Sequence, residues 1–238
     1  MTRIDGREAG DLREVTFQRH FTETAPGSVL ASFGRTRVLC TASYHDGVPG
    51  FLQGRGRGWL TAEYSMLPSS TGSRKTRDRA GKIDGRSVEI QRLIGRSLRS
   101  IVDFELTTER TIWIDCDVLQ ADGGTRTTAI SGAYVALHDL LVHMGNKRVL
   151  RDWPLRAQLA AVSVGAHDGE AICDLSYEED STADVDMNLV MTSEQDFVEV
   201  QGAAEGAPFS RDLLDRMLDL GAAGIERIFE IQRAALES

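Results

Sequence analysis

Features that would place a chain in several other protein classes are scarce or missing here. The 238 residues include only three cysteines, Cys40, Cys116 and Cys173, and none belongs to a CxxC pair. Each lies in an apolar, strand-like stretch, so we expect buried free thiols in a reducing compartment and no zinc site. The first residues lack the apolar core of a secretory signal, and no apolar run approaches the roughly 18 residues of a membrane span. We therefore expect a soluble, cytoplasmic protein that has no membrane partner.

The two common nucleotide-binding fingerprints are also missing. Neither GxxxxGK[ST] nor GxGxxG with its distal acid occurs in the sequence. An enzyme of unrelated chemistry that binds a nucleotide through a glycine turn is therefore a weaker alternative for this chain.

Charge is distributed unevenly along the sequence. The formal net charge is −9, which by itself argues against nucleic-acid binding. The segment 74–99 nevertheless carries nine basic residues and three acidic ones. Because a polyanion responds to the local field, this segment could bind RNA even though the whole chain is acidic.

Hydrophobic periodicity predicts strands followed by a helix in each half of the chain. The polar, turn-rich segment 68–85 is predicted to be a long exposed loop. The best seam between the halves lies at residues 146–154. Strands are predicted at 14–21, 28–33, 37–44, 59–66, 110–120, 159–165, 170–177, 185–192 and 197–202, and helices at 88–102, from the glycine turn at 123–124 to residue 146, and from about 210 to the end.

The helix predicted at 88–102 presents an apolar stripe on one face and arginines on the other. Arg92, Arg96 and Arg99 recur at helical spacing without intervening glutamates. Like charges at this spacing repel each other unless an anion approaches. The pattern is as compatible with an anion-binding face as with an ordinary solvated one.

The sharpest chemical signal is the run Gly123-Gly124-Thr125-Arg126 between a predicted strand and a predicted helix. Two glycines allow successive backbone N–H groups to point into one concavity. Thr125 is predicted to be the N-cap and a hydroxyl donor, and Arg126 adds a bidentate guanidinium at the positive end of the helix. The run predicts a phosphate site, and the simpler alternative is a tight turn followed by a surface arginine.

Two carboxylates come close together in the second half of the chain. Asp180 belongs to an acidic turn after a strand, and Asp186 opens the next strand. Carboxylates on neighbouring strand ends can hold one Mg²⁺ near a phosphodiester. An ordinary acidic turn is the alternative.

Together these stretches resemble the RNase PH family, whose relatives include polynucleotide phosphorylase and the ring subunits of the exosome. The resemblance extends from about Arg7 to the final helix and is carried by the stretches 26–43, 58–74, 85–100, 115–127 and 174–191. It implies an α+β fold of two β–α modules like the second domain of ribosomal protein S5. The modules would be residues 1–145 and 146–238, with mixed sheets packed against helices in one compact unit.

The resemblance implies a phosphorolytic 3′→5′ exoribonuclease, or tRNA nucleotidyltransferase. Inorganic phosphate would be the co-substrate, nucleoside 5′-diphosphates would leave the 3′ ends of tRNA precursors, and the reverse reaction would add nucleotides. The family resemblance also implies Mg²⁺, with Mn²⁺ as an alternative, and a homohexamer built as a trimer of dimers. A non-catalytic RNA-binding ring subunit is the main alternative, and it would lack the anion site or the carboxylate pair.

The resemblance further implies roles for individual residues. The catalytic residues would be Asp180, Asp186 and Arg126, of which the two aspartates would also be the metal ligands. The phosphate-binding residues would be Arg86, Gly124, Thr125 and Arg126. The RNA-binding residues would be Arg74, Lys75, Arg77, Arg79, Arg92 and Arg96.

Overall fold

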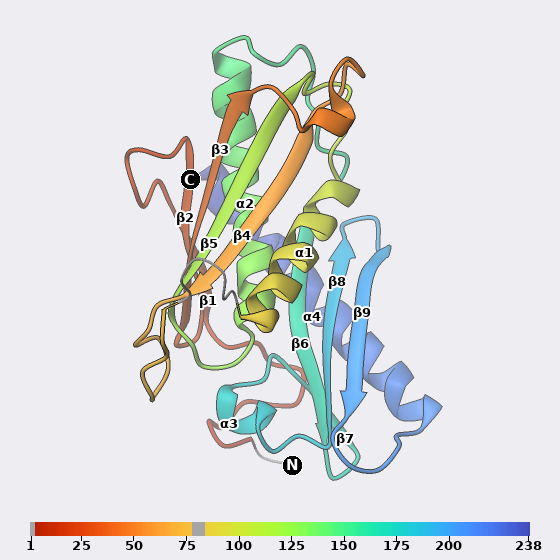
Figure 1. Ribbon diagram of the computed structural model, residues 1–238. Helices are drawn as coiled ribbons and strands as arrows, with labels where there is room; N and C mark the ends of the chain where they lie inside the picture. Colours follow the sequence, from red (N-terminus) through yellow and green to blue (C-terminus); the bar gives the residue numbers. More distant parts are fainter. Residues whose placement is uncertain (1–2, 78–83) are drawn as a thin grey trace.

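A computed structural model describes residues 3–77 and 84–238 and contains two β-sheets and four α-helices within these ranges (Figure 1). The strands are β1 (Val15–Arg19), β2 (Gly27–Phe33), β3 (Thr36–Asp46), β4 (Trp59–Met66), β5 (Arg110–Gln120), β6 (Leu159–His167), β7 (Glu170–Cys173), β8 (Val185–Thr192) and β9 (Phe197–Ala204). The helices are α1 (Gly85–Ser100), α2 (Thr125–Asn146), α3 (Tyr177–Asp180), α4 (Arg211–Glu237) and the short 3-10 helix η1 (Gly50–Leu52).

The first sheet has the order β1-β2-β3-β5-β4. All of its neighbouring strands are antiparallel except β4 and β5, which are parallel and are connected through α1. Alternation places Ile112, Ile114, Cys116 and Val118 of β5 in the core. The parallel pair brings the carboxyl ends of β4 and β5 to the same edge of the sheet, where β5 passes into α2.

The second sheet has the order β7-β6-β8-β9, and all of its neighbouring strands are antiparallel. Its strand β6 is buried along almost its whole length because it lies in the sheet interior with helices on both faces. Strand β9 is an edge strand with a mostly exposed pattern of side chains. This strand borders α1, so the second sheet reaches the helix that follows the basic loop.

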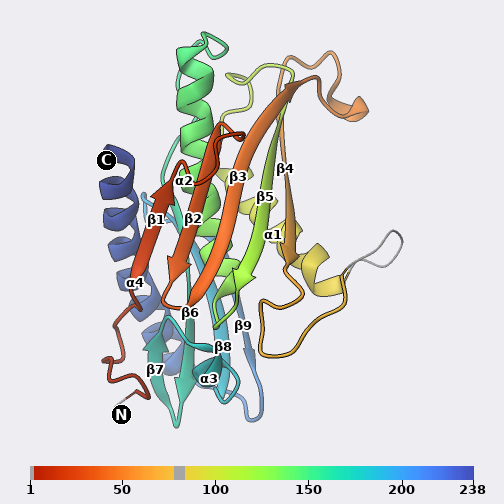
Figure 2. The same ribbon diagram turned by 90° about the vertical axis from the view of Figure 1, so that its left-hand side faces the viewer.

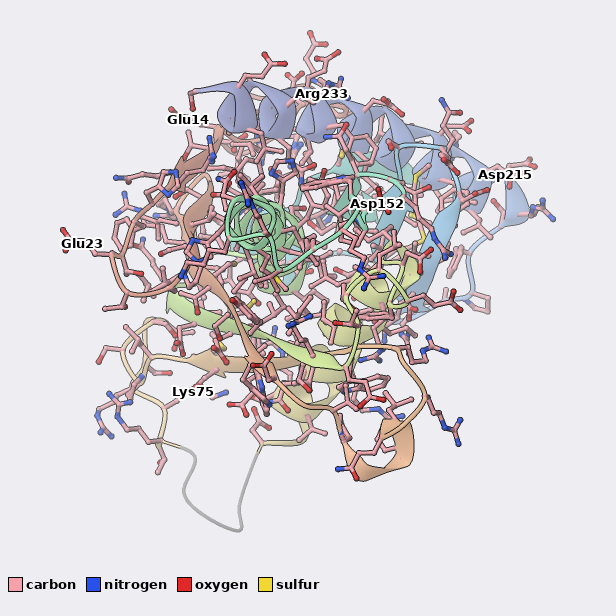
Figure 3. All side chains as sticks on the ribbon, turned by 90° about the horizontal axis from the view of Figure 1, so that it is seen from above. Glu14, Glu23, Lys75, Asp152, Asp215 and Arg233 are labelled. Carbon is pink, nitrogen blue, oxygen red and sulfur yellow. The ribbon has the colours of Figure 1, made fainter. Side chains whose placement is uncertain are left out.

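Helices and sheets are stacked in layers. Helices α1 and α2 lie between the two sheets, and α4 covers the outer face of the second sheet and reaches β1 (Figures 2 and 3). Helix α2 is apolar nearly all round because it packs on β2 and β3 on one side and on β6 on the other. The site at its N-terminus is therefore held by a rigid element.

The structure confirms the α+β fold and most of the predicted elements, including β4 and β5 with the predicted bounds. All three cysteines are buried and free, as expected. Burial raises the pKa of the Cys173 thiol to about 12. Helices α3 and η1 were not predicted. In the described part of the chain, no helix combines the length and hydropathy needed to cross a bilayer.

Candidate functional site

The turn between β5 and α2 has the backbone conformation that its two glycines allow. Gly123 has φ +78° and Gly124 has φ +63°, both in the left-handed region. The prediction that Thr125 is the N-cap is wrong, because Gly124 occupies that position and Thr125 begins the helix. The left-handed glycine turns its own carbonyl into the helix, where it accepts hydrogen bonds from the backbone and hydroxyl of Thr128. The backbone N–H groups of the first helical turn remain directed outward, which is the arrangement that binds anions.

Thr125 is buried, and its hydroxyl is oriented by a tyrosine from β4. The hydroxyl of Tyr64 donates to Oγ1 of Thr125 at 2.9 Å. Burial raises the pKa of Tyr64, so this phenol stays protonated and remains a donor. Because Thr125 accepts from Tyr64, its own O–H is available to donate to an anion. Sequence analysis missed Tyr64, whose position on the inward side of a strand resembles that of any core aromatic residue.

Two arginines flank the start of this turn from different helices. Arg126 is the second residue of α2, and Arg86 is the second residue of α1. Asp84 caps α1 by accepting a hydrogen bond from the backbone N–H of Arg86. This bond fixes the backbone of Arg86 and therefore the position of its Cβ. Both guanidinium charges act on Asp180, where they offset part of the rise in pKa that burial and the charge of Asp186 cause. The structure therefore brings Arg86, Arg126 and Asp180 together.

The two predicted carboxylates also lie near each other, although not both on strand ends. Asp180 ends the one-turn helix α3, which a capping box between Ser176 and Glu179 stabilises. Asp186 lies on β8, where it is paired with Gly165 of β6 and Ala203 of β9. Partial loss of solvent raises the pKa of Asp180, and the negative charge of Asp186 raises it further. The pair is thus close enough for its charges to interact.

A buried ion pair joins the glycine turn to the segment that carries Asp180. Arg13 donates from Nε and Nη2 to the Asp174 carboxylate at 3.0 and 2.7 Å, and from Nη1 to the carbonyl oxygen of Asp122 at 2.5 Å. Asp174 is fully buried. Burial opposes the charge on Arg13, but the Asp174 carboxylate raises the pKa of Arg13. No local pattern in the sequence indicates this pair, because its partners lie far apart along the chain.

The predicted RNA-binding residues are divided between the basic loop and α1. Arg74, Lys75 and Arg77 are exposed, and Arg79 lies outside the described residues. The loop leaves β4 beside the end of β5, since the backbone of Ala121 donates to the carbonyl oxygen of Ser70 at 2.8 Å. The positive loop is therefore attached at the edge of the sheet that leads into the glycine turn.

Arg92 and Arg96 are exposed and line a surface hollow of about 360 Å³ between α1 and β9. Arg96 donates to Glu199 of β9 at 2.6 Å. The expectation that Arg99 belongs to the same free arginine face is wrong. Its guanidinium lies over the Trp59 ring, 4.8 Å from the centroid, and donates to the Leu60 carbonyl oxygen.

The donor set of the carboxylate pair can be compared with the needs of a divalent cation. Among residues 3–77 and 84–238, no group of three or more His, Cys, Asp or Glu side chains could enclose a metal ion. Mg²⁺ in sites of phosphate chemistry commonly takes one or two carboxylates and completes its coordination with water and phosphate oxygens. Asp180 and Asp186 supply two carboxylates beside an anion site, so these residues fit Mg²⁺.

The N-terminus of α2, two arginines and a carboxylate pair lie near one another. This combination of fold and residues is typical of an enzyme acting on phosphate esters. Residues 11–143 match the 3′ exoribonuclease family, domain 1, and residues 157–224 match the 3′ exoribonuclease family, domain 2. The chain therefore belongs to this 3′ exoribonuclease family, and it is a phosphorolytic 3′→5′ exoribonuclease that uses inorganic phosphate as its co-substrate.

Individual relatives agree with this assignment. Ribonuclease PH of Synechococcus sp. (strain JA-2-3B'a(2-13)) is 56% identical over 237 residues, which cover 98% of this chain and 97% of the relative. The crystal structure of rice (Oryza sativa) Rrp46 has a TM-score of 0.80 at 21% identity and covers 99% of this chain and 100% of its own. An Archaeoglobus fulgidus exosome structure with RNA bound to the active site has a TM-score of 0.81 at 23% identity, covering 96% and 91%. These two structures share the fold of this chain.

Proposed function

We propose that this exoribonuclease trims the 3′ ends of tRNA precursors and binds its orthophosphate between the N-termini of α1 and α2. The observation that carries the proposal is the contact between the glycine turn before α2 and the start of α3, which carries Asp180, since a Cβ at Gly123 would lie 2.8 Å from the Tyr177 backbone nitrogen. Left-handed Gly124 leaves the first N–H groups of α2 free to bind an anion. Thr125 would donate its hydroxyl to the phosphate, and Arg86 and Arg126 would supply charge.

The proposed reaction needs positioning and charge stabilisation more than covalent chemistry from the protein. An oxygen of orthophosphate attacks the last phosphodiester in line, and the bond from phosphorus to the 3′ oxygen breaks. That oxygen becomes the 3′-hydroxyl of the shortened RNA, and the terminal nucleotide leaves as its 5′-diphosphate. Arg126, Arg86 and Thr125 would hold the attacking phosphate and stabilise charge as it moves. Because the product keeps a phosphoanhydride, the reaction should also run in reverse.

Asp180 and Asp186 would hold Mg²⁺, with Mn²⁺ as an alternative, because they supply two carboxylates next to the proposed phosphate site. When bound, such an ion would neutralise charge on phosphate oxygens near the scissile bond. Burial, and after it the charge of Asp186, raises the pKa of Asp180, and a cation between the two carboxylates would offset both effects.

RNA would be held mainly through its phosphates. The exposed cations Arg74, Lys75 and Arg77, with Arg92 and Arg96 on α1, would contact the backbone. The RNA bound at the active site of the A. fulgidus exosome supports an RNA 3′ end at the corresponding place here. We also propose that the protein forms a homohexameric ring built as a trimer of dimers, and native mass spectrometry would measure this assembly. We propose a cytoplasmic location as well, which the three free thiols support.

The decisive experiment incubates the protein with a tRNA precursor carrying a short 3′ extension, in Mg²⁺ with phosphate or with buffer alone. Nucleoside diphosphates should appear only with phosphate, and EDTA should stop their release until Mg²⁺ is restored. Arg126→Ala should slow phosphorolysis by about 10²–10³-fold, as the loss of one anion-stabilising donor does elsewhere, without unfolding the protein. Near-normal turnover of that variant would contradict the phosphate site, and nucleoside monophosphates in buffer alone would contradict phosphorolysis.

A further inference from the structure

The guanidinium of Arg126 is already held on one side by two residues that have no role in the site described so far. Its Nη1 donates to Oε1 of Glu89 on α1 at 3.1 Å and to Oε1 of Gln201 on β9 at 2.8 Å. The Gln201 amide also donates to the same Glu89 oxygen at 3.1 Å. The three side chains therefore form a closed set of hydrogen bonds that connects α1, α2 and β9.

This arrangement uses one nitrogen of the guanidinium and leaves the opposite edge open. Nη1 carries two hydrogens, and the two acceptors account for both. Within the part of the chain that the structure describes, neither Nε nor Nη2 of Arg126 makes a hydrogen bond. These two nitrogens form the fork that binds carboxylate or phosphate oxygens in pairs. Arg3 uses the same fork on the Glu179 carboxylate, with both distances at 2.7 Å.

One anchoring residue also ties Arg126 to β9, which pairs with the strand that carries Asp186. Gln201 is paired with Asn188 in the β8–β9 ladder, and two positions along the same ladder Ala203 is paired with Asp186. The side chain of Arg126 is 17% exposed and that of Glu89 is 48% exposed, so the set lies at the mouth of the site. A guanidinium on a long side chain has many conformations, and fixing Nη1 removes most of them before an anion arrives.

We propose that Glu89 and Gln201 are positioning residues that hold Nη1 of Arg126 so that its Nε and Nη2 fork faces the orthophosphate. The inference rests on the proposed function, because it assigns Arg126 to phosphate binding. Residue 89 holds Nη1 of Arg126 through its oxygen as a hydrogen-bond acceptor, and the negative charge of Glu89 is not required. A neutral acceptor at position 89 therefore preserves phosphate binding, and loss of the acceptor weakens it.

The test compares Glu89→Ala, Glu89→Gln and Arg126→Ala in steady-state phosphorolysis with phosphate and RNA varied separately. For Glu89→Ala we expect the KM for phosphate to rise about tenfold, or ~1.4 kcal/mol, while the KM for RNA changes less than about twofold. Glu89→Gln should restore the KM for phosphate to within about twofold of the parent value. Glu230→Ala removes an exposed carboxylate from the outer side of α4 and is the matched control, which should be unchanged.

The possible failures can be told apart. If Arg126→Ala leaves the KM for phosphate unchanged, the proposed phosphate site itself is wrong. If Arg126→Ala raises that KM but Glu89→Ala does not, or Glu89→Gln is as impaired as Glu89→Ala, only the positioning role is refuted. Adding Glu89→Ala to Arg126→Ala should cause no further loss, and an additional loss would show that Glu89 acts independently of Arg126. Thermal unfolding of each variant separates these results from misfolding.

Discussion

Single residues in this protein show how burial decides what an ion pair contributes. The side chains of Arg13 and Asp174 are 6% and 0% exposed. The Asp174 carboxylate accepts from the side chain and the backbone N–H of Arg13, and the Arg13 guanidinium also donates to the Asp122 carbonyl oxygen. On the surface of α4, Arg211 and Asp215 form a pair whose side chains are 80% and 50% exposed. Water screens the second pair and not the first, so the two should differ strongly in their effect on stability.

Arg13→Met should lower the free energy of unfolding by about 3–5 kcal/mol, because it leaves the buried Asp174 carboxylate without its main partner. Arg211→Met should lower it by less than about 1 kcal/mol, the usual range for exposed pairs. Urea unfolding at one fixed protein concentration measures both, which keeps any contribution from subunit association constant. Equal losses in the two variants would mean that Arg13 and Asp174 are not a buried pair in solution.

At the scale of elements, periodicity predicted well wherever one face of a strand or helix is buried. The bounds of β4 and β5 came from strict alternation, and Ser210 was expected to open the last helix and is its N-cap. Helix α3 was missed because four residues contain too little of a helical period to be recognised. The sequence predicts Thr125 as the N-cap of α2 because threonine is a preferred N-cap residue. In the structure, Gly124 with its left-handed φ is the N-cap, and the helix begins at Thr125.

Only those residues of the candidate site that lie in local motifs were predictable. Local motifs located Gly124, Arg126, Asp180 and Asp186, since each lies in a short stretch with its own chemical signature. Contacts between residues from distant elements could not be predicted, because nothing in the sequence near Glu89 indicates that Gln201 lies beside it. Packing also changed one assignment, since Arg99 shares the spacing of Arg92 and Arg96 but lies against Trp59.

Gly123→Ala should disturb the contact between the glycine turn and α3, and so reduce activity. A Cβ at this position would lie 2.5 Å from the Leu175 carbonyl oxygen and 2.8 Å from the Tyr177 backbone nitrogen. Backbone atoms cannot yield as a flexible side chain does, so α3 and its Asp180 would have to move. We expect phosphorolysis to fall by at least about tenfold, since small misplacements of reacting groups can cost ~10²-fold.

The matched control for this substitution is Gly169→Ala in the turn between β6 and β7. Gly169 has a similar φ of +77°, but no atom lies within 4 Å of its added Cβ. Both variants bear the left-handed penalty of ~1–2 kcal/mol, and only Gly123→Ala has the backbone collision. Gly123→Ala should therefore unfold at a lower temperature, as measured by circular dichroism, and catalyse phosphorolysis more slowly than Gly169→Ala. If the two variants behave alike, the turn and α3 are not in contact.

At the scale of the whole molecule, an acidic protein must attract a polyanion. The net charge of −9 repels RNA at long range, and the segment 74–99 has to reverse that field locally. Figure 2 shows the chain that follows β4 leaving the first sheet at the end where β5 passes into α2. In Figure 3, Lys75 lies at the outer margin of the molecule, away from α4. The exposed cations Arg74, Lys75 and Arg77 therefore lie on the loop that begins at the edge of the sheet next to the glycine turn.

This placement predicts how binding responds to salt when the loop charges are removed. Each cation that neutralises a phosphate of single-stranded RNA contributes ~0.7 to the slope of log affinity against log salt concentration. Replacing Arg74, Lys75 and Arg77 by alanine should therefore reduce the slope by about 2. RNA affinity measured by fluorescence anisotropy at several salt concentrations, in EDTA to prevent turnover, tests this expectation.

The control removes three equally exposed cations from the opposite end of α2, where Lys147, Arg148 and Arg151 lie. Lys147 and Arg151 are changed to alanine, and Arg148 to asparagine because its φ is +57°. Both triple variants change the net charge by the same amount, so a purely global field would weaken binding equally in the two. A local field predicts that the control keeps the parent slope, since charges farther away than a Debye length of about 8–10 Å are screened at ordinary salt. Equal losses in the two variants would mean that net charge governs RNA binding and that the loop has no special part in it.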